Sequence, residues 1–188
     1  MLKRFVVKKN EQGALLKDGD FERLLNAGRH YFLDPLGRLS LVVWKLDAPM
    51  DDRDVVDYLI RFEPETAAAC FEKMELGEDE AGLRYENDLL VEVLPPGARR
   101  YHWTGLIAHR LEKVDLRQRY AVPRELASHL VQPGLRDRSV AGLAGLLIAQ
   151  VPAYHVGVLK VDGQVQRLLP SGVEAFWRFN RDVQEELV

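Results

Sequence analysis

The chain is short of cysteine, of long apolar runs and of any excess of one charge, and each shortage excludes a class of protein. Its 188 residues include a single cysteine, so neither an intrachain disulfide nor a cysteine-only zinc site can form. The most apolar stretch, residues 140–149, is far shorter than the roughly 20 residues of a membrane-spanning helix. Residues 1–13 also lack the apolar segment of a signal peptide.

Charge and composition point to a globular protein that binds no nucleic acid. The 26 basic residues are balanced by 29 acidic ones, and acids interleave with basic pairs such as Lys8-Lys9. A nucleic-acid binder would instead concentrate its basic residues on one surface. With 47% hydrophobic and 29% charged residues, the composition is that of an ordinary folded protein, in which we expect Cys70 to be a small buried side chain.

Three segments of 22 residues align without gaps, which indicates that one unit has been copied twice. They run from Gly13 to Asp34, from Gly82 to Trp103 and from Gly157 to Arg178. The first and third copies share nine of 22 residues, where composition alone would give roughly one or two. In this alignment the aromatic residues that close the copies are Phe32, Tyr101 and Phe176.

Turn-forming residues fall at fixed offsets in every copy. A glycine opens the copy, a turn pair follows five residues later, and a further glycine lies nine residues beyond that pair. Two-residue turns between short apolar runs are a strong hairpin signal, because glycine, asparagine and aspartate tolerate the positive φ that such turns require. These positions are Gly13, Asp18, Gly19 and Gly28 in the first copy, Gly82, Asn87, Asp88 and Gly97 in the second, and Gly157, Asp162, Gly163 and Gly172 in the third.

The pattern predicts an α+β fold dominated by β-structure, with three tandem antiparallel hairpin or meander units, barrel-like or roll-like, joined by short helices. A lone hairpin cannot bury its apolar face in water, so the units must pack on one another or curl up. Pro64 and Pro123 each start a stretch with helix-forming residues. We expect β units at 1–50, 76–118 and 151–188, and helical connectors at 51–75 and 119–150.

Several stretches resemble the slipins of the stomatin/SPFH (band 7) family. In that family an extended strand leads to a glycine, a short turn, an Arg-Leu-Leu run and a second turn with glycine. The matching stretches run from Glu11 to His30 and from Val151 to Asn180, and residues 79–87 are similar as well. In slipins this is the opening hairpin of the SPFH domain, here present in multiplied form along the whole chain.

The resemblance implies a scaffold without chemistry of its own. Slipins are membrane-associated, assemble into large oligomers and organise neighbouring proteins. This chain departs from them because it lacks the N-terminal hydrophobic hairpin and the long helix that follows the SPFH domain. The last residues, from Glu185 to Val188, look like the middle of a strand, so we expect a longer protein. Membrane contact is then indirect or made by other regions, on the cytoplasmic side, where the chain is peripheral to the membrane.

No residue pattern favours catalysis, a metal or a cofactor. The histidines do not fall at His-x-x-x-His spacing, and no serine lies in a Gly-x-Ser-x-Gly elbow. Acidic groups such as residues 51–52 and 78–80 are expected to be solvated loop residues. We therefore name no catalytic or metal residue. The candidate interaction residues are the aromatics Tyr31, Tyr101, Trp103 and Trp177, for which packing between units is the alternative.

Three hypotheses for function follow. The first is a slipin-like scaffold that binds protein partners and forms homo-oligomers. The second is a monomeric adaptor that binds a peptide or protein strand at a sheet edge, near Leu24 or Leu168. The third is a small hydrolase or metalloenzyme, which stoichiometric zinc in the purified protein would support.

Overall fold

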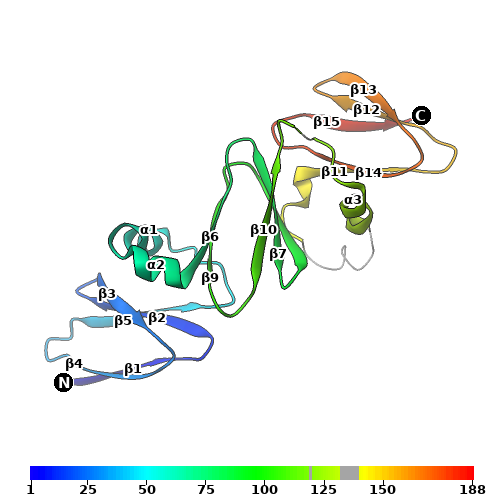
Figure 1. Ribbon diagram of the computed structural model, residues 1–188. Helices are drawn as coiled ribbons and strands as arrows, with labels where there is room; N and C mark the ends of the chain where they lie inside the picture. Colours follow the sequence, from blue (N-terminus) through cyan, green and yellow to red (C-terminus); the bar gives the residue numbers. More distant parts are fainter. Residues whose placement is uncertain (119, 132–139) are drawn as a thin grey trace. The chain divides into compact units, whose positions relative to one another are not determined.

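The computed structural model of the chain describes residues 1–118, 120–131 and 140–188. Antiparallel strands dominate this part of the chain, and three short α-helices accompany them, so the β-dominated fold with short helices is confirmed (Figure 1). The strands form small open sheets of two or three strands rather than a closed barrel in the described residues. The three helices are α1 (Arg53–Phe62), α2 (Pro64–Cys70) and α3 (Arg124–Leu130).

The fifteen strands described fall into three modules of five consecutive strands. The first module holds β1 (Leu2–Val7), β2 (Glu11–Lys17), β3 (Asp20–Leu25), β4 (Gly28–Leu33) and β5 (Leu39–Lys45). The second holds β6 (Phe71–Glu75), β7 (Glu80–Glu86), β8 (Leu89–Leu94), β9 (Arg99–Trp103) and β10 (His109–Asp115). The third holds β11 (Leu146–Val151), β12 (Gly157–Val161), β13 (Gln164–Leu169), β14 (Gly172–Trp177) and β15 (Val183–Leu187).

All three modules share one topology. The first strand of a module pairs with the fourth in a two-stranded sheet, as in β1–β4, β6–β9 and β11–β14. The second strand lies between the third and the fifth in a three-stranded sheet, as in β3-β2-β5, β8-β7-β10 and β13-β12-β15. The repeat found in the sequence is therefore a repeat of structure. It begins earlier than the aligned segments, because β6 and β11 lie in stretches that we expected to be helical connectors.

The turn pairs take up the backbone conformation that their composition favours. Each pair joins the second and third strands of its module, and each of its residues has positive φ, which suits Asn, Asp and Gly. A register shift also recurs in each module, two residues after the opening glycine. The φ angles are 55° and 94° at Asp18 and Gly19, 48° and 64° at Asn87 and Asp88, and 51° and 78° at Asp162 and Gly163.

The glycine that opens each aligned copy packs closely against the residue at or just after the C-terminal end of the first strand of its module. A Cβ atom built on it would lie within 3.0 Å of the side chain six residues earlier, so a larger residue would push the neighbouring strand away. The glycine is needed here for space, not for an unusual φ. The distances are 2.7 Å from Gly13 to Val7 Cγ2, 2.9 Å from Gly82 to Leu76 Cδ1 and 2.9 Å from Gly157 to Val151 Cγ2.

The structural alignment of the fourth strands differs by one residue from the gapless sequence alignment. The Leu76 N–H donates to the Ala98 carbonyl oxygen at 3.0 Å, and the Thr104 N–H donates to the Cys70 carbonyl oxygen at 2.9 Å. This pairing places Ala98 where the other modules have Gly28 and Gly172. The reason is the turn at residues 95–98, which holds one residue more than its counterparts.

The shift changes which residues correspond in the three modules. His102, not Tyr101, takes the position of Phe32 and Phe176. Trp103 takes the position of Leu33 and Trp177. Phe32 and Phe176 also have the same neighbour in the outer modules, since Arg23 is 5.3 Å from the centroid of Phe32, and Arg167 is 5.7 Å from that of Phe176.

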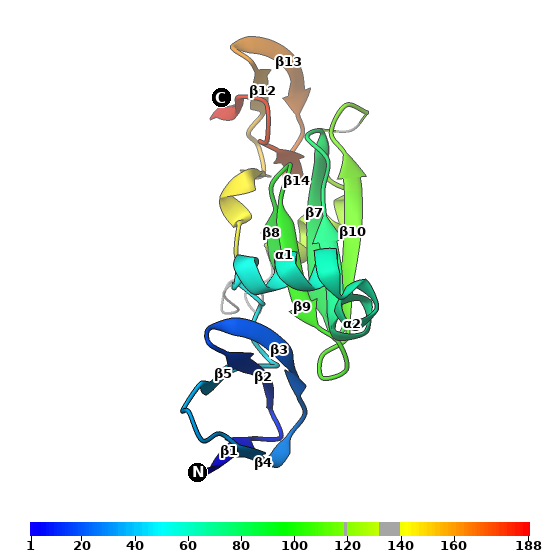
Figure 2. The ribbon, with the colours of Figure 1, turned by 90° about the vertical axis from the view of Figure 1, so that its left-hand side faces the viewer.

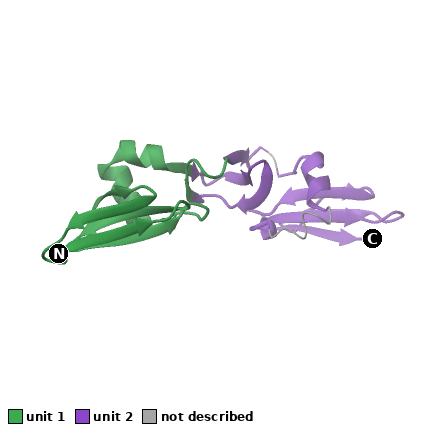
Figure 3. Cartoon of the chain, turned by 90° about the horizontal axis from the view of Figure 1, so that it is seen from below, with its two compact units in different colours: residues 1–73, 100–108 green, residues 74–99, 109–188 purple. Residues whose placement is uncertain are grey.

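The chain divides into two compact units, shown in different colours in Figure 3. Unit 1 comprises residues 1–73 and 100–108, and unit 2 comprises residues 74–99 and 109–188. The boundaries fall inside β6 and β9, so the second module contributes residues to both units.

Unit 1 contains two apolar clusters. One fills the first module between its two sheets, with Val7, Leu15 and Leu25 buried at its centre. The other lies on the opposite side of the three-stranded sheet, where α1 and α2 run side by side (Figure 2). Its buried members are Met50, Val56, Leu59, Ala67, Phe71, Tyr101 and Trp103.

Unit 2 has the same arrangement. One cluster fills the third module, around Leu159, Leu169 and Phe176. The larger cluster lies on the outer side of the β8-β7-β10 sheet, where α3 and residues of the third module join it. Its buried members are Ala81, Leu83, Leu90, Val93, Leu116, Val122, Ala127, Leu130, Val140, Leu146, Ala175 and Trp177.

Candidate interaction surfaces

Side chains able to ligate a metal do not gather in the described part of the chain. No group of three or more His, Cys, Asp or Glu residues could hold an ion among the described residues. His30 Nε2 instead lies 2.8 Å from the Asn26 carbonyl oxygen, and His155 Nδ1 lies 3.1 Å from the Ala153 carbonyl oxygen. Burial raises the pKa of the Cys70 thiol, which disfavours the reactive thiolate.

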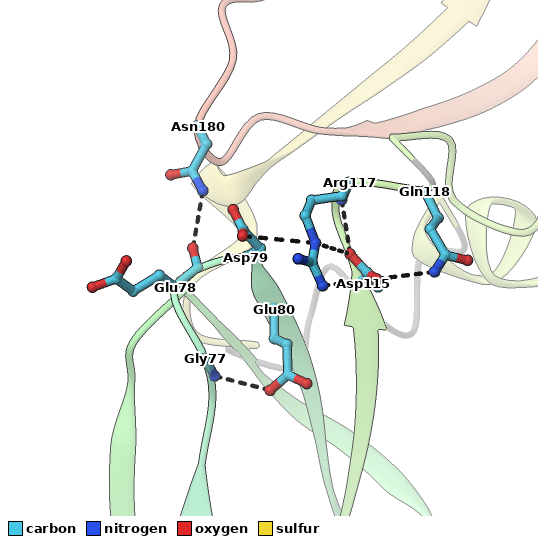
Figure 4. A network of polar contacts seen from close by, with 8 residues as sticks. All are labelled: Gly77, Glu78, Asp79, Glu80, Asp115, Arg117, Gln118 and Asn180. Carbon is cyan, nitrogen blue, oxygen red and sulfur yellow. Dashed lines mark hydrogen bonds and ion pairs between the residues drawn. The ribbon is translucent and has the colours of Figure 1, made fainter.

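The acidic residues 78–80 take part in a network of polar contacts in unit 2 (Figure 4). Glu80 Oε2 accepts a hydrogen bond from the Gly77 N–H at 2.9 Å, and Arg117 Nε lies 3.7 Å from Asp79 Oδ2. Asn180 Nδ2 donates to the Glu78 carbonyl oxygen at 3.1 Å, which ties the loop after β14 to the turn before β7. The group thus links two loops far apart in the sequence.

The electrostatics of this network suit a structural role. The backbone N–H of Gly77 is the main cause that holds the pKa of Glu80 below its usual value. Hydrogen bonds from Arg117 do the same for Asp115, which also accepts from Gln118 Nε2 at 3.1 Å. The lowered pKa values keep Glu80 and Asp115 ionised, which suits carboxylates that hold loops through N–H and guanidinium donors.

The four candidate aromatics do not form one surface. Tyr101 and Trp103 are buried in unit 1, and Trp177 is buried in unit 2, where each packs against an outer sheet face. Tyr31 alone is exposed. Each of the four belongs to the fourth strand of its module and points away from that module's own core. We call this side of a β1–β4, β6–β9 or β11–β14 sheet the two-strand outer face.

In unit 1 the two-strand outer face covers the outer side of a three-stranded sheet. Trp103 lies 6.0 Å from Trp44 of β5 between ring centroids, and Phe21 of β3 lies 5.5 Å from Tyr58 of α1. The segment before α1 also bonds to β9, because the Met50 N–H donates to the Tyr101 carbonyl oxygen at 2.9 Å. Helix α1 and the two-strand outer face of the second module therefore both pack on the outer side of the β3-β2-β5 sheet. We call the covered side, which faces away from the module core, the three-strand outer face.

Unit 2 repeats this contact with different residues. Trp177 lies in one apolar cluster with Leu83 and Val93 on the three-strand outer face of the second module, together with residues of α3. The Val122 N–H, just before α3, donates to the Ala175 carbonyl oxygen at 2.9 Å. Ala175 holds the position of Tyr101, so the two hydrogen bonds are equivalent. The same interface has thus been built twice in the chain.

Two faces of this kind are left open at the ends of the series. On the two-strand outer face of the first module, Leu33 is 82% exposed, whereas Trp103 and Trp177 at the same position are 2% and 1% exposed. Leu2 and Tyr31 of this face are exposed too, while their counterparts in the later modules are buried. The face consists of Leu2, Arg4, Val6, Arg29, Tyr31 and Leu33.

The three-strand outer face of the third module is the second open face. Leu168 is 63% exposed there, whereas its counterpart Val93 in the second module is 1% exposed. Val165 is exposed as well, although its counterpart Leu90 is buried. The face consists of Val158, Lys160, Val165, Leu168, Gln184 and Glu186.

The sequence predicts neither face as a site, although Tyr31 of the first face is among the candidate aromatics. The predicted turn residues lie at the hairpin tips and sheet junctions, where they shape the modules and do not converge on one place. Leu168 is predicted from the sequence only as part of a sheet edge, and Leu2 and Leu33 are not among the predicted interaction residues. The repeat itself carried the signal, since the same positions hold apolar residues in all three copies.

Comparison with protein-family models, with curated proteins and with solved structures finds no match for this chain. In the residues that the structure describes, no helix has the length and apolar character needed to cross a bilayer.

Proposed function

We propose that this chain is a non-enzymatic scaffold of slipin type, whose function is to hold sheet faces in a fixed arrangement for protein partners. The resemblance of residues 11–30 and 151–180 to slipins suggests the class. The observation that carries the proposal is the interface built twice, in which a helix and a two-strand outer face cover a three-strand outer face. Repetition of one packing contact suits a protein that organises others by geometry.

The polar groups support the same proposal. The buried Arg84 contacts Glu92 and Glu86 and lies at a position where the other modules have leucine. The carboxylates of Figure 4 brace loops. In both groups the carboxylates contact arginine side chains or backbone N–H donors, which is the arrangement of structural ion pairs.

Sedimentation of the purified chain over a wide range of concentrations tests the scaffold function. A self-assembling scaffold shows an average mass that rises with concentration. A chain that stays monomeric throughout contradicts the proposal. Metal analysis of the same sample addresses the hydrolase alternative, because one zinc ion per chain would favour that alternative instead.

A sheet-edge adaptor is the second candidate, and one observation favours it. In unit 2 the edge of β8 already pairs with a further segment of the chain at Ala141. The Val93 N–H donates to the Ala141 carbonyl oxygen at 2.8 Å, and the Ala141 N–H donates to the Val91 carbonyl oxygen at 3.0 Å. β13, the counterpart of β8, is the outermost strand of its own sheet. An adaptor that binds a partner strand there stays monomeric in the sedimentation experiment, which separates the two functions.

A further inference from the structure

We propose that two copies of this chain associate head to tail, with the two-strand outer face of one first module on the three-strand outer face of another third module. The proposal rests on the scaffold function and names the partner and the surfaces that such a scaffold would use. Its basis is the pair of intrachain interfaces, which serve as a template for the contact between copies. The two-strand outer face of the first module and the three-strand outer face of the third module are not covered in this way.

The first step is the match between the open faces and the closed ones. Leu2 and Leu33 are opposite each other in the β1–β4 sheet, as Leu146 and Trp177 are in β11–β14. The second pair is buried against another module, and the first pair is exposed to solvent. Since both pairs are apolar and hold the same positions, the exposed pair is suited to the same kind of neighbour.

The second step is the nature of that neighbour. In both units the cover of a two-strand outer face comes from the three-strand outer face of the preceding module. Among the described residues, none covers Leu2 and Leu33 of the first module, and the third module presents a three-strand outer face with exposed Val165 and Leu168. Another copy of the chain therefore supplies the missing surface on either side.

The third step concerns geometry and strength. The contact joins two different faces, so it is heterologous and generates a ring or an open chain of copies instead of a symmetric dimer. In both units a connecting helix packs on the three-strand outer face beside the two-strand outer face. A second copy would supply the two-strand outer face but no such helix. We therefore expect weak association, with a Kd on the order of 100 µM.

The test uses two variants, each of which blocks one face. Leu33→Glu places a carboxylate on the two-strand face, and Leu168→Glu places one on the three-strand face. Each should weaken self-association at least about tenfold, because the contact would bury an unpaired charge. Mixed in equal amounts, the two variants should form one-to-one dimers that do not grow, since only one pair of intact faces remains.

The control is Leu106→Glu, because this leucine is also exposed (52%) and lies in a loop outside both faces. It should sediment like the wild type, and circular dichroism of all three variants should show the wild-type fold. Wild-type self-association that neither face variant weakens, or a mixture that gives no dimers, would overturn the interface and leave the scaffold function standing. A wild type that is monomeric up to about 1 mM overturns both.

Disulfide trapping gives an independent measurement. In a Cys70→Ser background, Leu33→Cys and Leu168→Cys are prepared separately and oxidised alone or together. The mixture should give a cross-linked dimer, and each variant alone should give at least about tenfold less, because a heterologous contact never brings two copies of one face together. Equal cross-linking in the single samples would contradict the head-to-tail arrangement.

Discussion

Arg84 of β7 and Glu92 of β8 form an ion pair, with 2.8 Å between Arg84 Nε and Glu92 Oε2, and the arginine side chain is 10% exposed. The same cross-strand position is occupied by Leu15 with Arg23 in the first module and by Leu159 with Arg167 in the third. The second module thus differs from its neighbours by a coupled change. It has the arginine inside and the acid on the adjacent strand.

The coupling predicts that the two changes are tolerated only together. Glu92→Arg should lower the free energy of unfolding by about 3 kcal/mol, because it removes a carboxylate from the buried Arg84 and places a second cation beside it. Arg84→Leu should cost about 1–2 kcal/mol, because it leaves two carboxylates without their cation. The double variant Arg84→Leu with Glu92→Arg, which has the pair of the outer modules, should lie closer to the wild type than the sum of the single effects.

A urea-unfolding double-mutant cycle measures this coupling. The control is Lys113→Ala, because its contact with Glu80 is exposed and should contribute under about 1 kcal/mol. Additive effects of the two single substitutions would show that Arg84 and Glu92 do not stabilise the module as a unit.

The turn of the second module can be improved. Asn87 and Asp88 both have positive φ, and the other two turns place glycine at the second position. Asp88→Gly should raise the free energy of unfolding by about 0.5–1 kcal/mol, because Asn-Gly is favoured in this turn type. Gly163→Ala should do the opposite by about 1 kcal/mol. Thermal unfolding of both variants measures these two opposite changes in stability. A loss of stability in Asp88→Gly would contradict the prediction for this turn.

The opening glycines predict a clash that a second substitution relieves. In Gly157→Ala the new Cβ would lie 2.9 Å from Val151 Cγ2 and 3.1 Å from Leu169 Cβ, so we expect a loss of about 1–3 kcal/mol. Val151→Ala removes the nearer atom, so the double variant should lose less than the sum of the two single losses. Gly37→Ala is unsuitable as a control because of its positive φ, and Gly77→Ala, with no atom nearer than 3.5 Å, is the matched choice.

The sequence predicted the hairpins well because their determinants are local. Asp18-Gly19 and its counterparts require only the conformational freedom of two residues, which the sequence states directly. β6 and β11 were missed because each pairs with a strand whose residues lie more than 20 positions later, β9 and β14, and local patterns do not report such partners.

The open faces could not be found from residue type at all. Leu33 and Trp103 hold equivalent positions and are both apolar, yet one is exposed and the other buried. What separates them is the presence of a neighbouring module, which is a property of the whole chain. The single additional residue at 95–98 also concealed the match of Trp103 with Trp177, because a gapless alignment paired Trp177 with His102.

The buried carboxylate of Asp34 predicts a loss of stability in acid. Burial opposes its ionisation, but hydrogen bonds from the Leu39 N–H at 3.0 Å and the Arg38 N–H at 2.8 Å, with Lys3 Nζ at 3.3 Å, outweigh this and hold its pKa below the usual value. The unfolded chain then binds this proton more readily than the folded one. The stabilisation is complete above the ordinary pKa of about 3.9 and is lost as the pH falls through the folded pKa.

Asp34→Asn isolates this contribution. The variant should be less stable than the wild type at pH 7, because the amide nitrogen cannot replace an accepting oxygen for the two N–H donors. The difference should shrink as the pH is lowered below about 4. Urea unfolding at several pH values measures it, and a difference that stays constant into acid would show that the Asp34 charge does not matter.

Glu185 predicts a pH dependence of opposite sign. It lies opposite Leu159 in the third module, where the first module has Leu41, and its Oε1 is buried without a hydrogen-bond partner. Burial raises its pKa, so the folded chain binds this proton more readily than the unfolded one. The carboxylate therefore destabilises the fold at pH values above the raised pKa, and this penalty disappears below the ordinary value of about 4.3.

Glu185→Leu should consequently raise the free energy of unfolding by about 1 kcal/mol at pH 7, and the gain should diminish as the pH approaches 4. The control is Gln166→Leu on the exposed strand β13, because it removes no charge and its effect should be independent of pH. Thermal unfolding at pH 7 and in acid compares the two. A gain for Glu185→Leu that is as large in acid as at neutrality would place its origin in packing alone, and a loss at pH 7 would show that the Glu185 carboxylate stabilises the third module.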